Sequence, residues 1–487
     1  MKKLSLIILS ISSMIYATPK ATLHSNSTLT YHDIPQDVTT ISDMFTQGSF
    51  YGRLRFNSSA FKWDDEITKD GKWIRKDNAI AAIGGSLIYN SAYLYGLGFR
   101  VGGYASKAYG SLDDDLAYLY KGGKDLICRY DMLSDGSSDM AVLAQAYIEY
   151  RYKSGYFQYG RVLFDSFLTK SNDTKMIPNG FEGYTYHSSD IPDTKIKAAY
   201  LLRQKLKDHT SYHHLLAWQP RTTTDKYAPY TQNDDSAMHR GLSLDKLHQR
   251  GIDDRLVVLE ATNQTIHNLK ITANYTAVPK LLSSAMMQLD YKISYGKWQI
   301  KPALRYMYQF DDQAGKIGGA NLKTITAGYK NPDSLDTYMI AARLDLVRDS
   351  YKLRFGYSYI ADKADIVAPW RGFPTGGFTR AMSQYNWYAN TKTYMARVDL
   401  NLGKMDIAKS TTATIKYAIQ DFDDKKLGVP SDNDIITLDV IKRFENEPNL
   451  YLKFRFAHSF GKSTTYGTIT KPENSYSEGR LELNYLF

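Results

Sequence analysis

The sequence predicts an all-β protein, a transmembrane antiparallel β-barrel of about 18 strands. Strand-like alternation of polar and apolar residues recurs from about Phe50 to Phe487. The chain ends on one such segment, Arg480–Phe487, which places Leu481 and Leu483 on one face and Glu482 on the other. No segment approaches the ~20 consecutive apolar residues of a membrane-spanning helix. A closed barrel, which pairs every backbone group, is therefore the expected way for this chain to cross a membrane, with a soluble edge strand as the alternative for the last segment.

The first residues have the pattern of a secretory signal peptide. Lys2 and Lys3 form the positive region, Leu4–Met14 the short apolar core, and Ile15–Ala17 the small-residue cleavage site. We therefore expect residues 1–17 to be a signal peptide, residues 18–46 an N-terminal lead-in without a clear strand, and residues 47–487 one transmembrane β-barrel domain. The lead-in is either flexible or tucked into the barrel mouth.

Composition is consistent with a membrane barrel and narrows the classes of partner. The single cysteine, Cys128, forms no disulfide within the chain. The 40 tyrosines suit membrane interfaces, although soluble β proteins are also rich in tyrosine. The formal charge of +10 is spread through the strands instead of forming one basic run, so we expect no nucleic-acid partner.

Turn signals and polar segments divide the predicted strands in order. We expect strands at 50–57, 93–105, 140–152, 298–310, 337–347, 351–359, 393–402, 412–420, 435–444, 450–456 and 480–487. Short turns are expected on the periplasmic side at 90–91, 153–155, 296–297, 331–333 and 349–350. Outer loops are expected at 106–139, 164–180, 204–254, 311–320, 362–383, 421–432 and 461–476. Both termini should be periplasmic, which requires an even number of strands.

Placing the apolar face of each strand toward lipid leaves a lumen that is rich in arginine. In the first strand Phe50, Leu54 and Phe56 face outward, so Arg53 and Arg55 face inward. The same reasoning predicts a basic track in the lumen: Arg53, Arg55, Arg151, Arg305, Arg343, Arg354, Arg397, Arg443 and Arg455. Glu149 and Asp399 are inward acids. Two interpretations stay open and are compatible with each other: these arginines pair with inward acids, or a subset of them attracts anionic solutes.

Other signals do not indicate a site. His213, His214, His239 and His248 lack the spacing of a metal site, and the acidic runs at 113–115 and 234–235 are typical of solvated loops. No glycine-rich loop has the setting of a nucleotide site. We expect no cofactor and no metal.

Three segments carry a resemblance to a known family. Gly160–Thr169, continuing through Asn172–Asn179 to Phe181–Gly183, resembles the third-loop signature of the OprD-like outer-membrane porins. Residues 384–388 with 393–399 look like that family's aromatic stretch before an Arg-x-Asp strand, and Ala368–Arg380 is similar to its epsilonproteobacterial branch.

The resemblance implies an integral protein of the Gram-negative outer membrane with 18 strands, a monomer or homotrimer, whose third loop folds inward to narrow the pore. Its expected partners are outer-membrane lipids, lipopolysaccharide and small anionic or zwitterionic solutes. The constriction loop would include Asp165, Ser166, Asn172, Asp173, Thr174, Lys175 and Pro178. Lysine at 175 departs from the family's arginine and lacks its planar fork.

These features together predict a porin for passive, selective diffusion of small polar solutes, expected to carry a carboxylate. The first alternative is a barrel enzyme of the lipase or protease type. Its nearest candidate pair, His458 and Ser459, points to opposite faces of one strand and therefore cannot form a dyad alone. The second alternative is a barrel adhesin with a closed lumen. We predict that the protein is not an enzyme.

Overall fold

A computed structural model of the chain describes residues 21–23, 29–31, 35–171, 173, 175–216, 238–382 and 385–487. Among the residues predicted above, the signal peptide, Asn172, Thr174, residues 234–235 and Gln384 lie outside the described residues. In the described part of the chain, no helix combines the length and apolarity that crossing a membrane requires.

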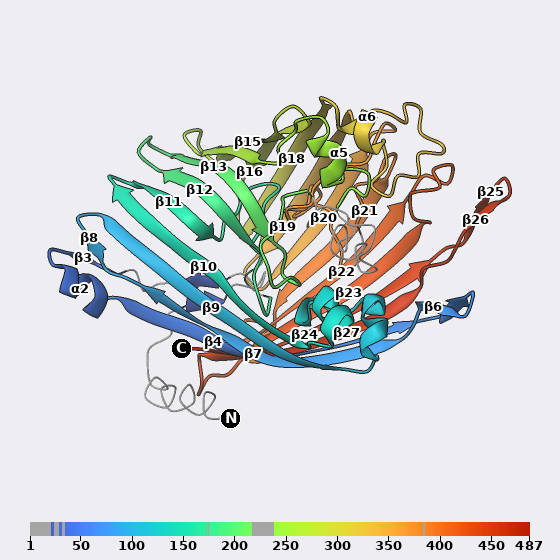
Figure 1. The fold of residues 1–487 in the computed structure, drawn as a ribbon. Helices are drawn as coiled ribbons and strands as arrows, with labels where there is room; N and C mark the ends of the chain where they lie inside the picture. The colour runs from blue at the N-terminus through green and yellow to red at the C-terminus, as the bar shows by residue number, and fades with distance from the viewer. Residues whose placement is uncertain are drawn as a thin grey trace.

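The strands form one closed antiparallel barrel of 18 strands, as the sequence predicts (Figure 1). The last long strand pairs with the first, and backbone hydrogen bonds between Gly52 and Phe487 continue that pairing to the final residue. No edge of the long-strand sheet is left open to another chain. The long strands are β4 (Ser49–Trp63), β7 (Asn78–Asn90), β9 (Leu97–Gly110), β10 (Asp139–Tyr152), β11 (Gly155–Val162), β12 (Gly180–Ser188), β13 (Thr194–Lys205), β14 (Leu256–Asn263), β15 (Leu269–Val278), β16 (Leu282–Tyr291), β18 (Trp298–Asp311), β19 (Thr337–Arg348), β20 (Tyr351–Ile360), β21 (Lys392–Asn401), β22 (Thr411–Asp421), β23 (Asn433–Arg443), β24 (Leu450–Gly461) and β27 (Tyr476–Leu486).

Short elements decorate the barrel. The short strands are β1 (Ala21–Leu23), β2 (Leu29–Tyr31), β3 (Asp37–Val38), β5 (Ile67–Lys69), β6 (Lys72–Arg75), β8 (Tyr93–Leu94), β17 (Ile293–Tyr295), β25 (Thr464–Tyr466) and β26 (Ile469–Lys471). The helices are α2 (Ile41–Thr46), η1 (Asp114–Leu119), η2 (Lys124–Leu126), α3 (Arg129–Asp135), α5 (Leu244–His248) and α6 (Ala314–Gly318). The described part of the lead-in thus contains three short strands, β1, β2 and β3, and the helix α2, none of which the sequence predicts. β3 pairs in parallel with β8 of the barrel. Strands of two or three residues are too short to show a period-two pattern.

The two faces of the strands differ as period two requires. On β4, Phe50, Leu54 and Phe56 are exposed on the outside, whereas Arg53 and Arg55 are buried. On β27, Leu481 and Leu483 are exposed and Glu482 is buried. An exposed ring of apolar side chains around a closed barrel is the surface that lipid requires.

The two ends of the barrel differ in the length of their connections. Residues 153–154, 349–350 and 402–410 are typical of the short-turn end, where α2 also lies, and α6 and the β25–β26 hairpin lie at the opposite, long-loop end (Figure 1). The prediction of a short turn at 331–333 is wrong, because β18 and β19 join at the long-loop end through residues 312–336. Two connections at that end escaped the sequence reading: residues 64–77, which form the β5–β6 hairpin, and the tight turn at 279–281.

Loops from the long-loop end fill part of the barrel with an apolar core. Phe164 and Leu168 of residues 163–179, which we call the third loop, pack with Trp370 and Trp387 of residues 361–391, the seventh loop. The wall beneath contributes inward apolar residues: Val258, Met286, Met307, Met339 and Ile360. On this part of the wall the inner face is therefore partly apolar as well, because it covers a core instead of water.

Candidate pore constriction and its two cavities

The third loop is tied to the inner face of the barrel at its start and at its end. Lys197 Nζ donates to the Asp165 carbonyl at 2.7 Å, and the Phe167 amide donates to Glu260 Oε2 at 2.7 Å. Lys205 Nζ donates to the Pro178 carbonyl at 2.8 Å. These contacts hold the loop inside the barrel, because Lys197 and Lys205 of β13 and Glu260 of β14 bind its backbone from the wall.

The loop also closes on itself and reaches the first strand. Ser166 Oγ lies 2.7 Å from Thr169 Oγ1. Asp173 forms an ion pair with Arg53, and its carbonyl accepts a hydrogen bond from Arg55 Nη2 at 2.9 Å. Arg53 and Arg55 therefore hold the third loop in place, so both arginines support structure.

The seventh loop also folds inward and pairs with the third. Thr169 and Arg371 form an antiparallel bridge, the Lys170 amide donates to the Trp370 carbonyl at 3.0 Å, and the Gly372 amide donates to the Leu168 carbonyl at 2.9 Å. A Cβ at Gly372 would lie 2.2 Å from the backbone of Leu168, so only glycine permits this approach. Arg371 adopts a φ of 68°, a left-handed conformation that costs a non-glycine residue about 1 kcal/mol or more.

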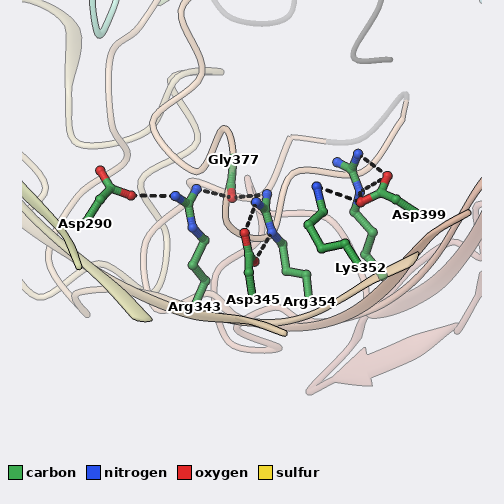
Figure 2. Close-up of polar contacts among 8 residues, drawn as sticks. Asp290, Arg343, Asp345, Lys352, Arg354, Gly377 and Asp399 are labelled. Carbon is green, nitrogen blue, oxygen red and sulfur yellow. Dashed lines mark hydrogen bonds and ion pairs between the residues drawn. The ribbon is translucent and has the colours of Figure 1, made fainter. Parts of the chain in front are cut away.

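Wall arginines anchor the other side of the seventh loop (Figure 2). Arg305 Nη1 donates to the carbonyls of Pro374 and Gly376 at 2.6 and 3.0 Å. Arg343 Nη1 and Arg354 Nη1 both donate to the Gly377 carbonyl, at 3.0 and 2.6 Å. The loop is thus held between the third loop and the strands β18, β19 and β20.

Two cavities lie on either side of these loops. A cavity of about 800 Å³ opens among Ser189, Ile191 and Lys270 at the short-turn end, and one of about 1160 Å³ opens among Trp63, Tyr118 and Pro472 at the long-loop end. We call them the short-turn cavity and the long-loop cavity. Arg371 and Phe373 border both, which places the seventh loop between them.

The long-loop cavity is lined by cations from loops and wall alike: Lys121, Lys124, Arg129, Lys175, Lys207, Arg240, Lys323, Arg371, Arg380, Lys416, Arg455, Lys471 and Arg480. Among the described residues of this lining, Asp125 is the only acid. It lies 3.1 Å from Lys175 and 3.7 Å from Lys207. Burial alone would raise the pKa of Asp125, but these two lysines hold it well below its usual range.

Several members of the predicted basic track are paired with acids. Arg343 pairs with Asp290 and Arg354 with Asp345, at 2.5 and 2.6 Å. Arg397 pairs with Asp399 at 2.5 Å, and Lys352 pairs with the same carboxylate at 2.8 Å (Figure 2). This part of the wall alternates in sign, so it forms a network of ion pairs along the lumen.

The remaining predicted residues lie apart from the constriction. Arg151 donates to Glu149 at 2.8 Å and stacks 3.5 Å from the ring of Tyr93. Arg443 is exposed near the short-turn rim of β23. Arg455 pairs with Asp439 at 2.5 Å and lines the long-loop cavity.

Sequence reasoning missed the role of the seventh loop. The sequence predicts an outer loop at 362–383 and a family resemblance at 368–380, but not that this loop folds inward, where it supplies Arg371 and Phe373, which border both cavities. Its density of glycine, proline and aromatic residues was the available signal for a loop that packs closely.

The two candidate residues of the enzyme alternative, His458 and Ser459, are neighbours on β24, where Ser459 is fully buried and His458 Nδ1 lies 2.8 Å from Ser477 Oγ of the neighbouring strand. His458 shares the outer face of β24 with the exposed Phe460 and contacts its ring edge-to-face, with 4.2 Å between centroids. This contact lies on the outer surface of the barrel, away from both cavities.

The chain matches no protein family in a scan of families and no sequence in a search of curated proteins. Solved structures do match. Pseudomonas aeruginosa OccK8 (OprE) has a TM-score of 0.68 at 13% identity, covering 91% of this chain and 99% of that chain. P. aeruginosa OpdK with vanillate gives 0.64 at 13%, covering 90% and 98%. Acinetobacter baumannii OccAB3 gives 0.64 at 14%, covering 90% and 99%. With its closed barrel and inward third loop, the chain therefore has the fold of the OprD-like outer-membrane porins.

Proposed function

We propose that this protein is an integral outer-membrane porin through which small polar solutes diffuse passively, with a preference for anions. The observation that carries the proposal is the pair of cavities that enter the barrel from opposite ends and share Arg371 and Phe373 as a common border. A solute that diffuses from one cavity to the other needs no reaction with the residues that line them. The lining must attract the solute enough for entry and bind it weakly enough for release.

The preference for anions rests on the lining of the long-loop cavity, where Asp125 is the only acid among the described residues. A cleft with low-dielectric walls and charge of one sign concentrates the opposite ion. Carboxylates are the first class of solute to test, since vanillate, found with P. aeruginosa OpdK, is a carboxylate. We also propose that the protein belongs to the epsilonproteobacterial branch of the OprD-like porins, which residues 368–380 resemble.

Reversal potentials under a KCl gradient test the proposal directly. The wild-type channel should conduct and prefer chloride, and Lys175→Glu should lower that preference because it replaces a cavity cation with an acid beside Asp125. Lys69→Glu makes the same charge change at an exposed site of β5 and should alter the preference little. A wild-type protein without conductance would contradict the porin proposal, and equal preference in wild type and Lys175→Glu would contradict its anion component.

Anion preference should also fall as the pH rises through 8. Burial lowers the pKa of Lys207, a lining residue of the long-loop cavity, to about 8. Arg371 and Lys124 act in the same direction, whereas Asp125 and Asp208 oppose the shift. A lysine with a lowered pKa is charged below that value and neutral above it, so the cavity loses positive charge between pH 7 and 9. Lys207→Arg should flatten this dependence, because arginine stays charged over the range. A pH-independent wild-type preference would be inconsistent with this assignment.

Conductance and an assay of phospholipid hydrolysis separate the two alternatives from the porin proposal. An adhesin with a closed lumen would pass no ions. An enzyme of the lipase type would hydrolyse phospholipid, and His458→Ala would abolish that activity.

A further inference from the structure

The positive charge of the long-loop cavity exceeds what its acids balance. Arg455 pairs with Asp439, Arg480 donates to Glu478 at 2.6 Å, and Asp125 is shared by two lysines. Six lining cations have no acid within ion-pair distance in the described part of the chain: Lys121, Arg240, Lys323, Arg380, Lys416 and Lys471.

Among these six cations, Arg380 has buried guanidinium nitrogens that lack a hydrogen-bond acceptor within the described ranges. Its guanidinium lies 4.9 Å from the ring of Phe373 and 5.3 Å from that of Tyr385. Its Nε and Nη1 atoms are buried and have no hydrogen-bond partner among the described residues. Buried donors without acceptors are unfavourable, and the guanidinium borders the long-loop cavity, so an anion in that cavity would stabilise a charge that no described acid balances.

The unbalanced cations come from different elements that meet around one space. Lys121 follows η1, Lys323 lies in the loop between α6 and β19, and Lys416 projects from β22. Aromatic rings accompany them, with Lys121 5.8 Å from the ring of Trp63 and Lys323 5.6 Å from that of Tyr388. One monovalent anion can neutralise only one of these positions, whereas a solute with several charged oxygens neutralises several at once.

We propose that the long-loop cavity is a binding site for solutes with two or more negative charges, such as polycarboxylates or condensed phosphates. This inference rests on the proposed function and narrows its class of solute. A multivalent anion gains attraction from each unbalanced cation, and the gain is large because the cavity is partly shielded from water. Monovalent carboxylates enter the same cavity but satisfy only part of its charge.

The experiment compares anions of different charge on the full-length protein in planar bilayers at low ionic strength. Tricarballylate and inorganic tripolyphosphate, added at the long-loop side, should reduce the current at concentrations about tenfold lower than acetate. Titration calorimetry of the detergent-solubilised protein should give the same order of affinities. Raising the KCl concentration toward 1 M should weaken both multivalent anions, since screening shortens the reach of each charge.

Lys121→Gln combined with Lys416→Gln removes two unbalanced cations and should weaken both multivalent anions about fivefold or more, with a much smaller effect on acetate. The matched control, Lys69→Gln with Lys72→Gln, removes two exposed lysines of the β5–β6 hairpin at the same end of the barrel. It should leave all three affinities close to wild type.

The outcomes separate this inference from the proposed function. Preference for tripolyphosphate alone or tricarballylate alone supports the inference and identifies phosphate or carboxylate as the recognised group. Equal affinity for acetate and the multivalent anions in a conducting, anion-selective channel overturns the inference and leaves the porin proposal intact. If calorimetry detects binding of the multivalent anions to a protein that carries no current, the binding site is supported and the porin proposal is overturned.

Discussion

Asp365→Ala is expected to loosen the inward loops and produce a noisy, less selective channel. Asp365 is fully buried and joins the seventh loop to residues 312–336, the sixth loop. Its carboxylate accepts hydrogen bonds from Tyr329 Oη at 2.7 Å and from Asn321 Nδ2 at 2.9 Å. It also accepts from the amides of Leu322 and Ala389, both at 2.9 Å.

Removing the carboxylate leaves four donors without their acceptor in an apolar setting. Each buried group left unpaired costs about 1–3 kcal/mol, so we expect a loss on the order of 3 kcal/mol or more in the free energy of unfolding. Urea unfolding in detergent and single-channel noise measure the two effects. Asp333→Ala, an exposed acid in the same loop, is the control. A quiet Asp365→Ala channel of wild-type stability would show that these hydrogen bonds do not hold the loops.

Arg305→Ala should widen the constriction. Besides its bonds to Pro374 and Gly376, the guanidinium lies 5.1 Å from the ring of Phe167 and 4.4 Å from that of Phe378. It therefore contacts both inward loops. Losing it leaves the two carbonyls unpaired and opens a space beneath the loops, at a cost of about 2–4 kcal/mol, and conductance should rise.

Arg305→Lys distinguishes an anchor from a guide for anions. Lysine keeps the charge but cannot reach two carbonyls with one planar fork. If Arg305 is an anchor, the lysine variant should resemble alanine in conductance, whereas a guide would keep wild-type selectivity with lysine. Arg348 lies on the neighbouring strand β19 and is exposed near the short turn. As the control, Arg348→Ala should leave conductance unchanged.

The sequence predicts the barrel well because the side-chain period of a strand is strict. Once Phe50 and Leu54 face lipid, Arg53 and Arg55 must face inward, and the same holds for Leu481 and Glu482. The strand number follows from that alternation together with the need for closure.

The constriction could not be predicted to the same depth. The bond from Lys170 to Trp370 joins residues 200 positions apart in loops without periodicity, so no local pattern indicates it. Near the long-loop end, Met286 and Met307 face inward and pack in the core beneath the loops. Both faces of these strands are therefore apolar there, and the polar–apolar alternation that distinguishes the lipid face from the lumen face is lost. The sequence also supplies charges without their partners, and only the fold distinguishes the paired Arg397 from Lys416, which has no ion pair among the described residues.

The apolar core shared by loops and wall has a consequence for protein engineering. Because Leu168 and Trp370 belong to the same buried apolar cluster as methionines that project from the strands, the inward loops do not pack independently of the wall. A loop transplanted from another barrel would pack against an inner strand surface whose side chains complement a different loop. Exchange of pore specificity between such proteins should therefore succeed only when Met286, Met307 and Met339 are exchanged along with the loops that cover them.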